Sequence, residues 1–315
     1  MWLIKSEEET DSEFGKRPEE RTIEEIIKNS VIIVDKHSGP TSHQISQWVK
    51  EIFQLKKTGH AGTLDPHVTG VLPMALENAV KTMPVLMGLD KEYIGIMHIH
   101  KEVPEEVLRE TISKFVGKIK QTPPKKSAVA RREREREIKF FDVLEIECRD
   151  VLFKVGCEAG TYVRKLCSDI GIALGVGANM KELRRTKAGN FTEEQSHSLV
   201  EIKDAYEFWK ENKDEERLKK ILIPIEFAID HVKKVFIKDS TIDAVCNGAP
   251  VYVNGITRVQ ENILRGENVV IMSLKNELVA LGIAKMSSKE MYERKKGLAI
   301  RTDRVIMQKG TYPKV

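Results

Sequence analysis

Cysteine is scarce in this chain of 315 residues. The four cysteines, Cys148, Cys157, Cys167 and Cys246, form no Cys-x-x-Cys pair. This spacing argues against a structural zinc site and against a disulfide framework. We therefore expect free thiols buried in the interior.

Long apolar runs are also missing. No stretch of about 18 apolar residues occurs, and the first residues, Met-Trp-Leu-Ile-Lys-Ser-Glu, lack the basic and apolar regions of a secretory signal. Neither a Walker nor a Rossmann glycine loop is present, and no segment repeats at the period of a solenoid. We expect a soluble, cytoplasmic protein with no membrane partner.

Charge is distributed unevenly. The net charge is +4, but residues 5–25 hold nine acids and four bases, so this segment is −5 and the remainder is +9. A basic body favours a partner with a phosphate backbone, through counterion release and electrostatic steering. The acidic segment is either a disordered tail or pairs with a basic face of the same chain, and the sequence leaves both open.

The length exceeds the usual domain size of about 100–200 residues, so we expect two domains. Val31–Val34 predicts a buried strand, and Thr41 or Ser42 caps the helix that follows it. A second helix starts at Pro104. From Val235 onward, short apolar runs alternate with glycine turns, which is typical of a small barrel.

A polar segment, residues 121–137, separates strand-like runs at 92–100 and 140–158. Its residues 125–137 contain six bases and three acids. The segment predicts an exposed loop or hairpin arm, which is either a solvated surface or a contact for backbone phosphates.

The run from Gly59 to Pro66 reads Gly-His-Ala-Gly-Thr-Leu-Asp-Pro and presents one carboxylate beside a histidine. Asp65 in such a glycine-held loop is either a turn former or a nucleophile. The upstream run from Asp35 to His43, Asp-Lys-His-Ser-Gly-Pro-Thr-Ser-His, indicates a strand end, a turn and a helix N-cap.

Together these runs resemble the first motif of the TruB-type pseudouridine synthases, which Thr-Gly-Val-Leu at 69–72 completes. His37 stands where the family has proline, which removes a fixed φ from the turn. Lys-Glu-Tyr at 91–93, Gly-Thr-Tyr-Val-Arg at 160–164 and Leu-Arg-Arg-Thr at 183–186 resemble three further family motifs. Several runs beyond residue 246 resemble a PUA module.

The resemblance implies that Asp65 is the catalytic residue, acting as nucleophile or base, that Arg164 pairs with it, and that Tyr93 stacks on the target base. Isomerising uridine needs no redox change and no group donor, so we expect no cofactor and no metal. It needs a carboxylate in a dry pocket, where burial strengthens electrostatic effects. The predicted substrate-binding residues are His60, Lys36, Tyr162, Leu183, Arg184 and Arg185.

The resemblance also implies an α+β protein. It has a pseudouridine synthase fold, with a mixed, mainly antiparallel sheet and flanking helices, and a small β-barrel-like PUA domain. We expect an acidic N-terminal extension at 1–30, the catalytic domain at 31–228 and the PUA domain at 232–308. This arrangement is similar to the archaeal dyskerin-type members.

For partners, the resemblance implies tRNA, modified at T-loop uridine 55, or an H/ACA guide RNA with its ribosomal RNA target and small protein subunits. A non-catalytic RNA scaffold is the alternative, and it predicts a broken Asp65–Arg164 pair. A hydrolase is disfavoured, because glycosidases usually use two carboxylates. His98 and His100 on one strand face could suggest a metal site, but no third ligand has suitable spacing.

Overall fold

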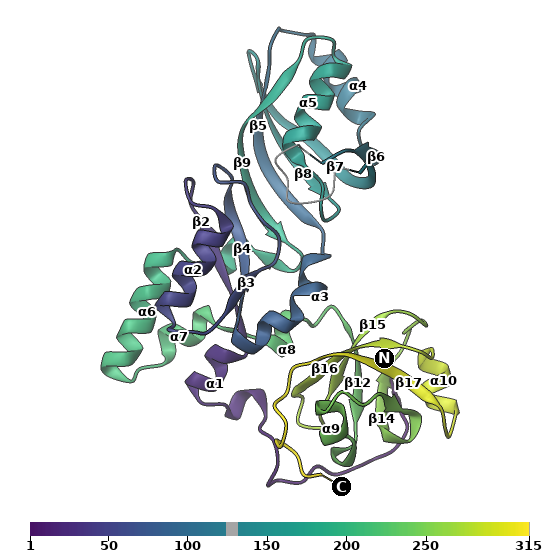
Figure 1. Cartoon of the computed structure of the whole chain (residues 1–315). Helices are drawn as coiled ribbons and strands as arrows, with labels where there is room; N and C mark the ends of the chain where they lie inside the picture. The colour runs from purple at the N-terminus through teal and green to yellow at the C-terminus, as the bar shows by residue number, and fades with distance from the viewer. Residues whose placement is uncertain (124–131, 315) are drawn as a thin grey trace.

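The computed structural model describes residues 1–123 and 132–314, so part of the predicted arm, residues 124–131, lies outside the described residues. Figure 1 shows a long curved sheet that extends away from a compact β module, and both ends of the chain lie at that module. The mixed, mainly antiparallel sheet with its helices and the separate β module confirm the predicted α+β fold.

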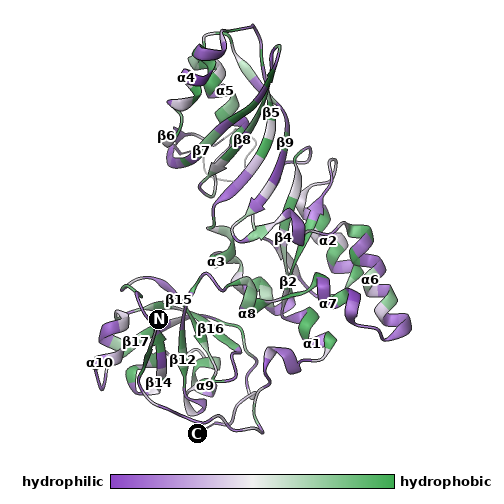
Figure 2. Cartoon of the chain, turned by 180° about the vertical axis from the view of Figure 1, so that it is seen from behind, coloured by the Kyte–Doolittle hydropathy of each residue, from purple (hydrophilic) through white to green (hydrophobic). Residues whose placement is uncertain are grey.

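The long sheet has ten strands in the order β11-β2-β4-β9-β5-β8-β7-β6, with β3 paired to β4 and β10 paired to β9. The described pairs are antiparallel except β4 with β9, which run parallel over two residue pairs. Strand β9 is largely hydrophilic in Figure 2, in line with its Lys-Glu-Leu-Arg-Arg-Thr-Lys sequence. The strands are β2 (Ser30–Lys36), β3 (Thr58–His60), β4 (Thr69–Leu76), β5 (Lys91–Ile99), β6 (Gly117–Gln121), β7 (Arg134–Glu147), β8 (Asp150–Cys157), β9 (Ala178–Ala188), β10 (Phe191–Thr192) and β11 (Ile223–Pro224).

Helices flank this sheet in two groups, with α4 and α5 against its far part and the others nearer the β module (Figure 1). Thr41 caps α2 by accepting a hydrogen bond from the Gln44 N–H, and α4 begins after Pro104, so both predicted helices are confirmed. The helices are α1 (Ile23–Lys28), α2 (Ser42–Ile52), α3 (Met83–Met87), α4 (Glu105–Ser113), α5 (Val163–Ala173), α6 (Leu199–Asn212), α7 (Glu216–Ile221) and α8 (Ile225–Ala228).

The strand-like run at 140–158 is divided into β7 and β8. Cys148 adopts φ +53° in the turn between them, a conformation that the apolar pattern does not reveal. Cys148 is also exposed, whereas the other three free cysteines are buried as expected. Among the described residues, no helix is long and apolar enough to cross a membrane.

The β module is a seven-stranded sheet in the order β1-β14-β12-β15-β16-β17-β13, with two helices. Its apolar strands enclose a separate core that includes Val235, Ile271 and Ile300. The elements are β1 (Trp2–Ile4), β12 (Lys233–Ile237), α9 (Asp239–Cys246), β13 (Val251–Tyr252), β14 (Ile256–Gln260), β15 (Asn268–Met272), β16 (Leu278–Ala284), α10 (Ser288–Glu293) and β17 (Leu298–Val305).

The acidic segment near the N-terminus lies on this module. Strand β1 pairs antiparallel with β14, and Leu3 lies opposite Val259. Lys238 Nζ lies 2.5 Å from Glu8 Oε1, and the Thr10 hydroxyl donates to Asp239. The sequence left open whether this segment is a disordered tail or pairs with its own chain. In the structure it pairs with its own chain.

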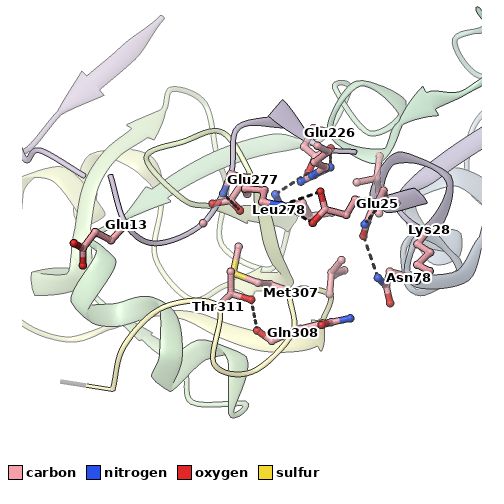
Figure 3. Close-up of a pocket in the computed structure, with 16 residues that line it drawn as sticks. Glu13, Glu25, Lys28, Asn78, Glu226, Glu277, Leu278, Met307, Gln308 and Thr311 are labelled. Carbon is pink, nitrogen blue, oxygen red and sulfur yellow. Dashed lines mark hydrogen bonds and ion pairs between the residues drawn. The ribbon is translucent and has the colours of Figure 1, made fainter. Parts of the chain in front are cut away.

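The two sheets meet at a junction that combines apolar packing with buried charge. Ile33 of β2 and Phe236 of β12 belong to one continuous apolar cluster. Arg21 donates to both carboxylate oxygens of Glu226 at 3.0 and 2.7 Å, and these side chains are only 12% and 7% exposed. A polar cavity of about 460 Å³ opens beside this pair, and Figure 3 shows Glu25, Glu226 and Glu277 around it.

Candidate active site

Asp65 lies in the loop between β3 and β4. Its neighbours Leu64 and Val68 are 3% and 4% exposed, so they anchor the loop in the core on both sides of the carboxylate. The Val68 N–H donates to the Asp65 carbonyl at 3.0 Å and closes a turn. The sequence folds here by burying two apolar side chains and leaving the acid between them at the surface.

Lys36 holds this loop from beneath. Its buried ammonium donates to the carbonyls of Pro66 at 2.8 Å, Val68 at 2.9 Å and His37 at 3.0 Å. Burial lowers the Lys36 pKa, and the charge of Asp65 opposes this shift. Three backbone carbonyls bind the ammonium, so Lys36 positions the loop in this structure, and its substrate contact stays a prediction.

Ser42, which the sequence reading treated only as a possible cap, also fixes the loop. Its hydroxyl accepts from the Leu64 N–H at 2.9 Å and donates to the Leu64 carbonyl at 3.1 Å. The Gly39 N–H donates to the Pro66 carbonyl at 3.0 Å. The Gly-Pro-Thr-Ser turn therefore binds the loop directly. From the sequence, this turn was known only to lie upstream of the loop.

Arg164, in the first turn of α5, reaches Asp65 from another part of the sheet. Its Nη1 lies 3.0 Å from Asp65 Oδ2. The Asp65 side chain is 48% exposed and that of Arg164 is 54% exposed. The expected pairing is present, but the expected dry pocket is not, because the described residues form only the floor of the site.

Tyr93 on β5 is 8% exposed, and it lies close enough to Asp65 for the carboxylate to influence its ionisation. Burial raises the Tyr93 pKa, and the adjacent Arg185 guanidinium opposes that shift. The phenol is therefore neutral at physiological pH. Lys91, two residues earlier, buries its ammonium against the Met87 and Leu89 carbonyls, and burial lowers its pKa to about 8.

Arg185 is 1% exposed and is also part of the scaffold. It donates to the Val71 carbonyl at 2.7 Å and to the Gly62 carbonyl at 3.0 Å, which ties β9 to β4 and to the Asp65 loop. Gly70 is required here, because it has φ +98° and a Cβ would lie 2.2 Å from the Arg185 carbonyl oxygen. Arg185 therefore positions the loop from a buried site, and its substrate contact stays a prediction.

Arg184 points to the other face of β9, because adjacent strand residues alternate. Its guanidinium donates to both Asp35 oxygens at 2.9 and 3.1 Å and to Glu193 at 2.5 Å. Two carboxylates pair with it, and its substrate contact stays a prediction. Leu183 is buried, and Gly95 makes room for it: a Cβ on Gly95 would lie 2.7 Å from Leu183 Cδ1.

His60 and Tyr162 are the remaining predicted site residues. The His60 ring packs edge-on against His43 with ring centroids 5.1 Å apart, and burial is the main cause that lowers the His60 pKa. Tyr162 is the N-cap residue of α5, and its backbone exchanges two hydrogen bonds with the Gln121 side chain, at 3.0 and 3.2 Å. Sequence reasoning missed Gln121, since a lone glutamine at a strand end gives no signal.

His98 and His100, at the far end of the sheet, each form a hydrogen bond with a protein side chain. His98 Nδ1 lies 2.6 Å from Asp150 Oδ1, and His100 Nε2 lies 2.9 Å from Asn179 Oδ1. Among residues 1–123 and 132–314, no group of three or more His, Cys, Asp or Glu side chains is arranged to hold a metal ion.

Four family models match successive segments of the chain. The DKCLD (NUC011) domain matches residues 1–46, and the N-terminal domain of the TruB family pseudouridylate synthases matches residues 50–163. The C-terminal domain of tRNA pseudouridylate synthase B matches residues 164–230, and the PUA domain matches residues 233–306.

Relatives match over almost their full lengths. A probable tRNA pseudouridine synthase B of Methanopyrus kandleri is 53% identical over 99% of this chain and 92% of its own length, and that of Methanocaldococcus jannaschii is 50% identical over 99% and 93%. A solved Cbf5-Nop10-Gar1 complex contains a chain with TM-score 0.93 and 50% identity, covering 100% of this chain and 96% of that one. A chain in an H/ACA RNP bound to a substrate RNA has TM-score 0.91 and 48% identity, covering 100% and 96%.

The fold and the paired acid and arginine define an RNA-modifying enzyme with an appended PUA domain. With relatives half identical over nearly the whole chain, it belongs to the TruB family of pseudouridine synthases. Its activity is that of an isomerase, which converts uridine to pseudouridine.

Proposed function

We propose that the chain isomerises uridine in folded RNA at Asp65, as the catalytic subunit of a guide-directed H/ACA ribonucleoprotein and also at T-loop uridine 55 of tRNA. The 3.0 Å ion pair between Asp65 and Arg164, beside the buried phenol of Tyr93, is the observation that carries this proposal. A non-catalytic scaffold has no need to maintain this pair.

In the reaction, the bond from C1′ to N1 breaks and a bond from C1′ to C5 forms. The proton leaves C5 and N1 gains one, so the atoms balance without a cofactor. Asp65 acts as the nucleophile or as a base toward a sugar proton. Arg164 pairs with the carboxylate and orients it, and the neutral Tyr93 ring stacks on the base.

The exposure of Asp65 and Arg164 indicates how the site is completed. The target uridine is stacked in folded RNA, so it must be extruded to reach Asp65. Once the RNA covers the loop, water is excluded and the pair interacts in a lower dielectric. The RNA therefore supplies the dry surroundings that the described residues do not provide.

The partners follow from the relatives. Solved structures similar to this chain are named as complexes with Nop10 and Gar1 and as an H/ACA RNP bound to substrate RNA. We assign catalysis to residues 31–228, with His60, Tyr162 and Leu183 lining the substrate side. We propose that the PUA domain at 232–308 binds the guide RNA. We also propose that the protein is cytoplasmic.

Tritium release from RNA labelled at uridine C5 tests the proposal. The purified chain is assayed alone on a tRNA transcript, then with a guide RNA, its target and the small protein subunits. Release in both assays supports both activities, and release only in the assembled mixture removes the stand-alone tRNA activity. No release in either would favour the scaffold.

A further inference from the structure

Three cationic side chains are buried beneath the Asp65 loop. Lys36 is 0% exposed, Arg185 is 1% exposed and Lys91 is 7% exposed. Each of them donates to backbone carbonyls, and Lys91 binds two carbonyls of the turn that precedes its own strand. Within the part of the chain that the structure describes, none of the three forms an ion pair with a carboxylate. The floor of the site therefore carries positive charge that no acid neutralises.

Lys91 approaches the Asp65 loop at the same point as Arg185. It lies two residues before Tyr93 on β5, so both side chains are on one face of that strand. A Cβ on Gly62, in the Asp65 loop, would lie 3.5 Å from Arg185 Nη1 and 3.6 Å from Lys91 Cε. The charge of Lys91 therefore lies next to that of Arg185, under the loop that holds Asp65.

The stability of the fold does not explain a charge at Lys91. Burial and the neighbouring Arg185 charge lower the Lys91 pKa to about 8, so the fold disfavours the ammonium. Two other titratable groups act on it: Asp90 opposes the shift, and the Cys157 thiol is neutral because burial raises its pKa to about 12. At pH 7 the ammonium is still mostly protonated. A charge that is kept at a cost to the fold points to a role in function.

The proposed reaction creates negative charge above this floor, on the base that stacks on Tyr93. When the bond from C1′ to N1 breaks, its electron pair stays with the uracil ring, whether Asp65 acts as nucleophile or as base. The ring carries this negative charge until C5 bonds to C1′. Fixed positive charges that water does not screen stabilise such a charge, and they need no rearrangement during the reaction.

We propose that Lys91 assists the isomerisation through its charge, by stabilising the uracil anion from beneath Tyr93 together with Lys36 and Arg185. The inference rests on the proposed function and adds a residue to it. The Lys91 ammonium is buried and held by two carbonyls, so it acts at a distance, as a positioning residue, and not by contact with the base.

The test compares two buried lysines. Lys91→Met keeps the length of the side chain and removes its charge. Lys275→Met is the matched control, because Lys275 is also 7% exposed and also donates to two carbonyls, those of Ser12 at 3.3 Å and Phe14 at 2.5 Å, but lies in the β module. Single-turnover tritium release is measured from pH 7 to pH 9, with saturating protein, in the assay in which the unmodified protein is active. RNA affinity is measured separately.

We expect Lys91→Met to lower the single-turnover rate at pH 7 about tenfold and to change RNA affinity by less than about twofold. Lys275→Met should leave the rate per folded molecule within about twofold of that of the unmodified protein. The rate of the unmodified protein should fall from pH 7 to pH 9, as Lys91 loses its proton. Lys275→Met should keep this decrease, and Lys91→Met should lose it, which a purely structural role would not produce.

Equal rates of Lys91→Met and Lys275→Met would overturn the inference, and so would a decrease with pH that persists in Lys91→Met. If Lys91→Met does not fold, Lys91→Gln takes its place with the same expectations, since its amide can still donate to the carbonyls. A rate of the unmodified protein that does not fall from pH 7 to pH 9 would also contradict the proposal. Failure of the proposed function is different: the unmodified protein then releases no tritium at any pH.

Discussion

Two arginine–carboxylate pairs among the described residues, one at the Asp65 loop and one at the junction of the two sheets, differ in exposure. At the catalytic loop, the side chains of Arg164 and Asp65 are 54% and 48% exposed, whereas those of Arg21 and Glu226 at the domain junction are 12% and 7% exposed. The first pair is open to solvent, and the second is closed inside the protein. Burial therefore distinguishes the pair that we propose to be reactive from one that is structural.

The surroundings of each pair support this reading. Glu226 also accepts from the Leu278 N–H at 3.1 Å, so its removal leaves several donors without a partner in the interior. Asp65 is held through its backbone, by neighbours that Lys36 and Ser42 bind, and its carboxylate contributes little to packing. Loss of charge at Asp65 should thus lower turnover with little effect on stability, and loss of charge at Glu226 should lower stability with little effect on turnover.

The largest expected effect is on turnover. Asp65→Asn should lower the tritium-release rate by about four orders of magnitude or more, because the amide keeps the shape but loses the nucleophile. Stability should change by less than about 1 kcal/mol, since the pair is exposed. RNA affinity should persist, and its loss would instead make Asp65 structural; Asp150→Asn, at an exposed ion pair far along the sheet, is the matched control.

The second effect is on stability. Glu226→Gln should reduce the free energy of unfolding by about 3–5 kcal/mol, because it leaves the Arg21 charge buried without its partner. Denaturant titration measures this change, with Glu216→Gln, in an exposed pair with Lys220, as the control. Turnover per folded molecule should stay within about twofold. If Glu226→Gln and Glu216→Gln lowered the free energy of unfolding equally, burial would not distinguish the two kinds of pair.

The third effect connects the two kinds of site. Lys36→Met should cost about 1–3 kcal/mol, because it deprives buried carbonyls of a donor, and should also slow turnover by loosening the Asp65 loop. Thermal unfolding and single-turnover tritium release are the paired measurements. A destabilised but fully active variant would show that the ammonium does not position Asp65.

The smallest effect is a pH dependence. Burial lowers the Lys91 pKa from 10.5 to about 8, so between these values the unfolded chain binds a proton that the folded chain has released. Stability should therefore rise by about 1 kcal/mol from pH 7 to pH 9 through this group. The Cys157 thiol acts in the opposite direction above pH 9, because burial raises its pKa to about 12.

Denaturant titrations at pH 7, 8 and 9 check this expectation. Lys91→Met should lose the rise, and Lys187→Met, at an exposed position on β9, should keep it. An unchanged slope in Lys91→Met would assign the rise to other groups.

The sequence predicted the family, the α+β fold and the pairing of Asp65 with Arg164, because these depend on motifs of fixed spacing. It did not distinguish Arg184 from Arg185, which are neighbours on β9 but face a carboxylate pair and a buried loop respectively. Strand register decides which side chain is buried, and β9 pairs with β5 through two bulges that no spacing rule reveals.

Other features depend on contacts between distant segments. The sequence showed that residues 5–25 are acidic, but their partners, such as Lys238 and Asp239, lie more than two hundred residues away along the chain. Gln121 gave no signal because its role depends on the position of Tyr162 in space. Sequence patterns thus report local structure well, and distant pairing only where a motif encodes it.

The pairing of β1 with β14 also constrains the order of events during synthesis. Leu3 and Val259 face each other in the β module, but about 250 residues separate them along the chain. At roughly 5–20 residues per second, strand β1 waits on the order of ten to fifty seconds on the ribosome before its partner is made. Until then the backbone edge of β1 has no partner strand, although Trp2 and Ile4 on this strand stay exposed even in the folded module.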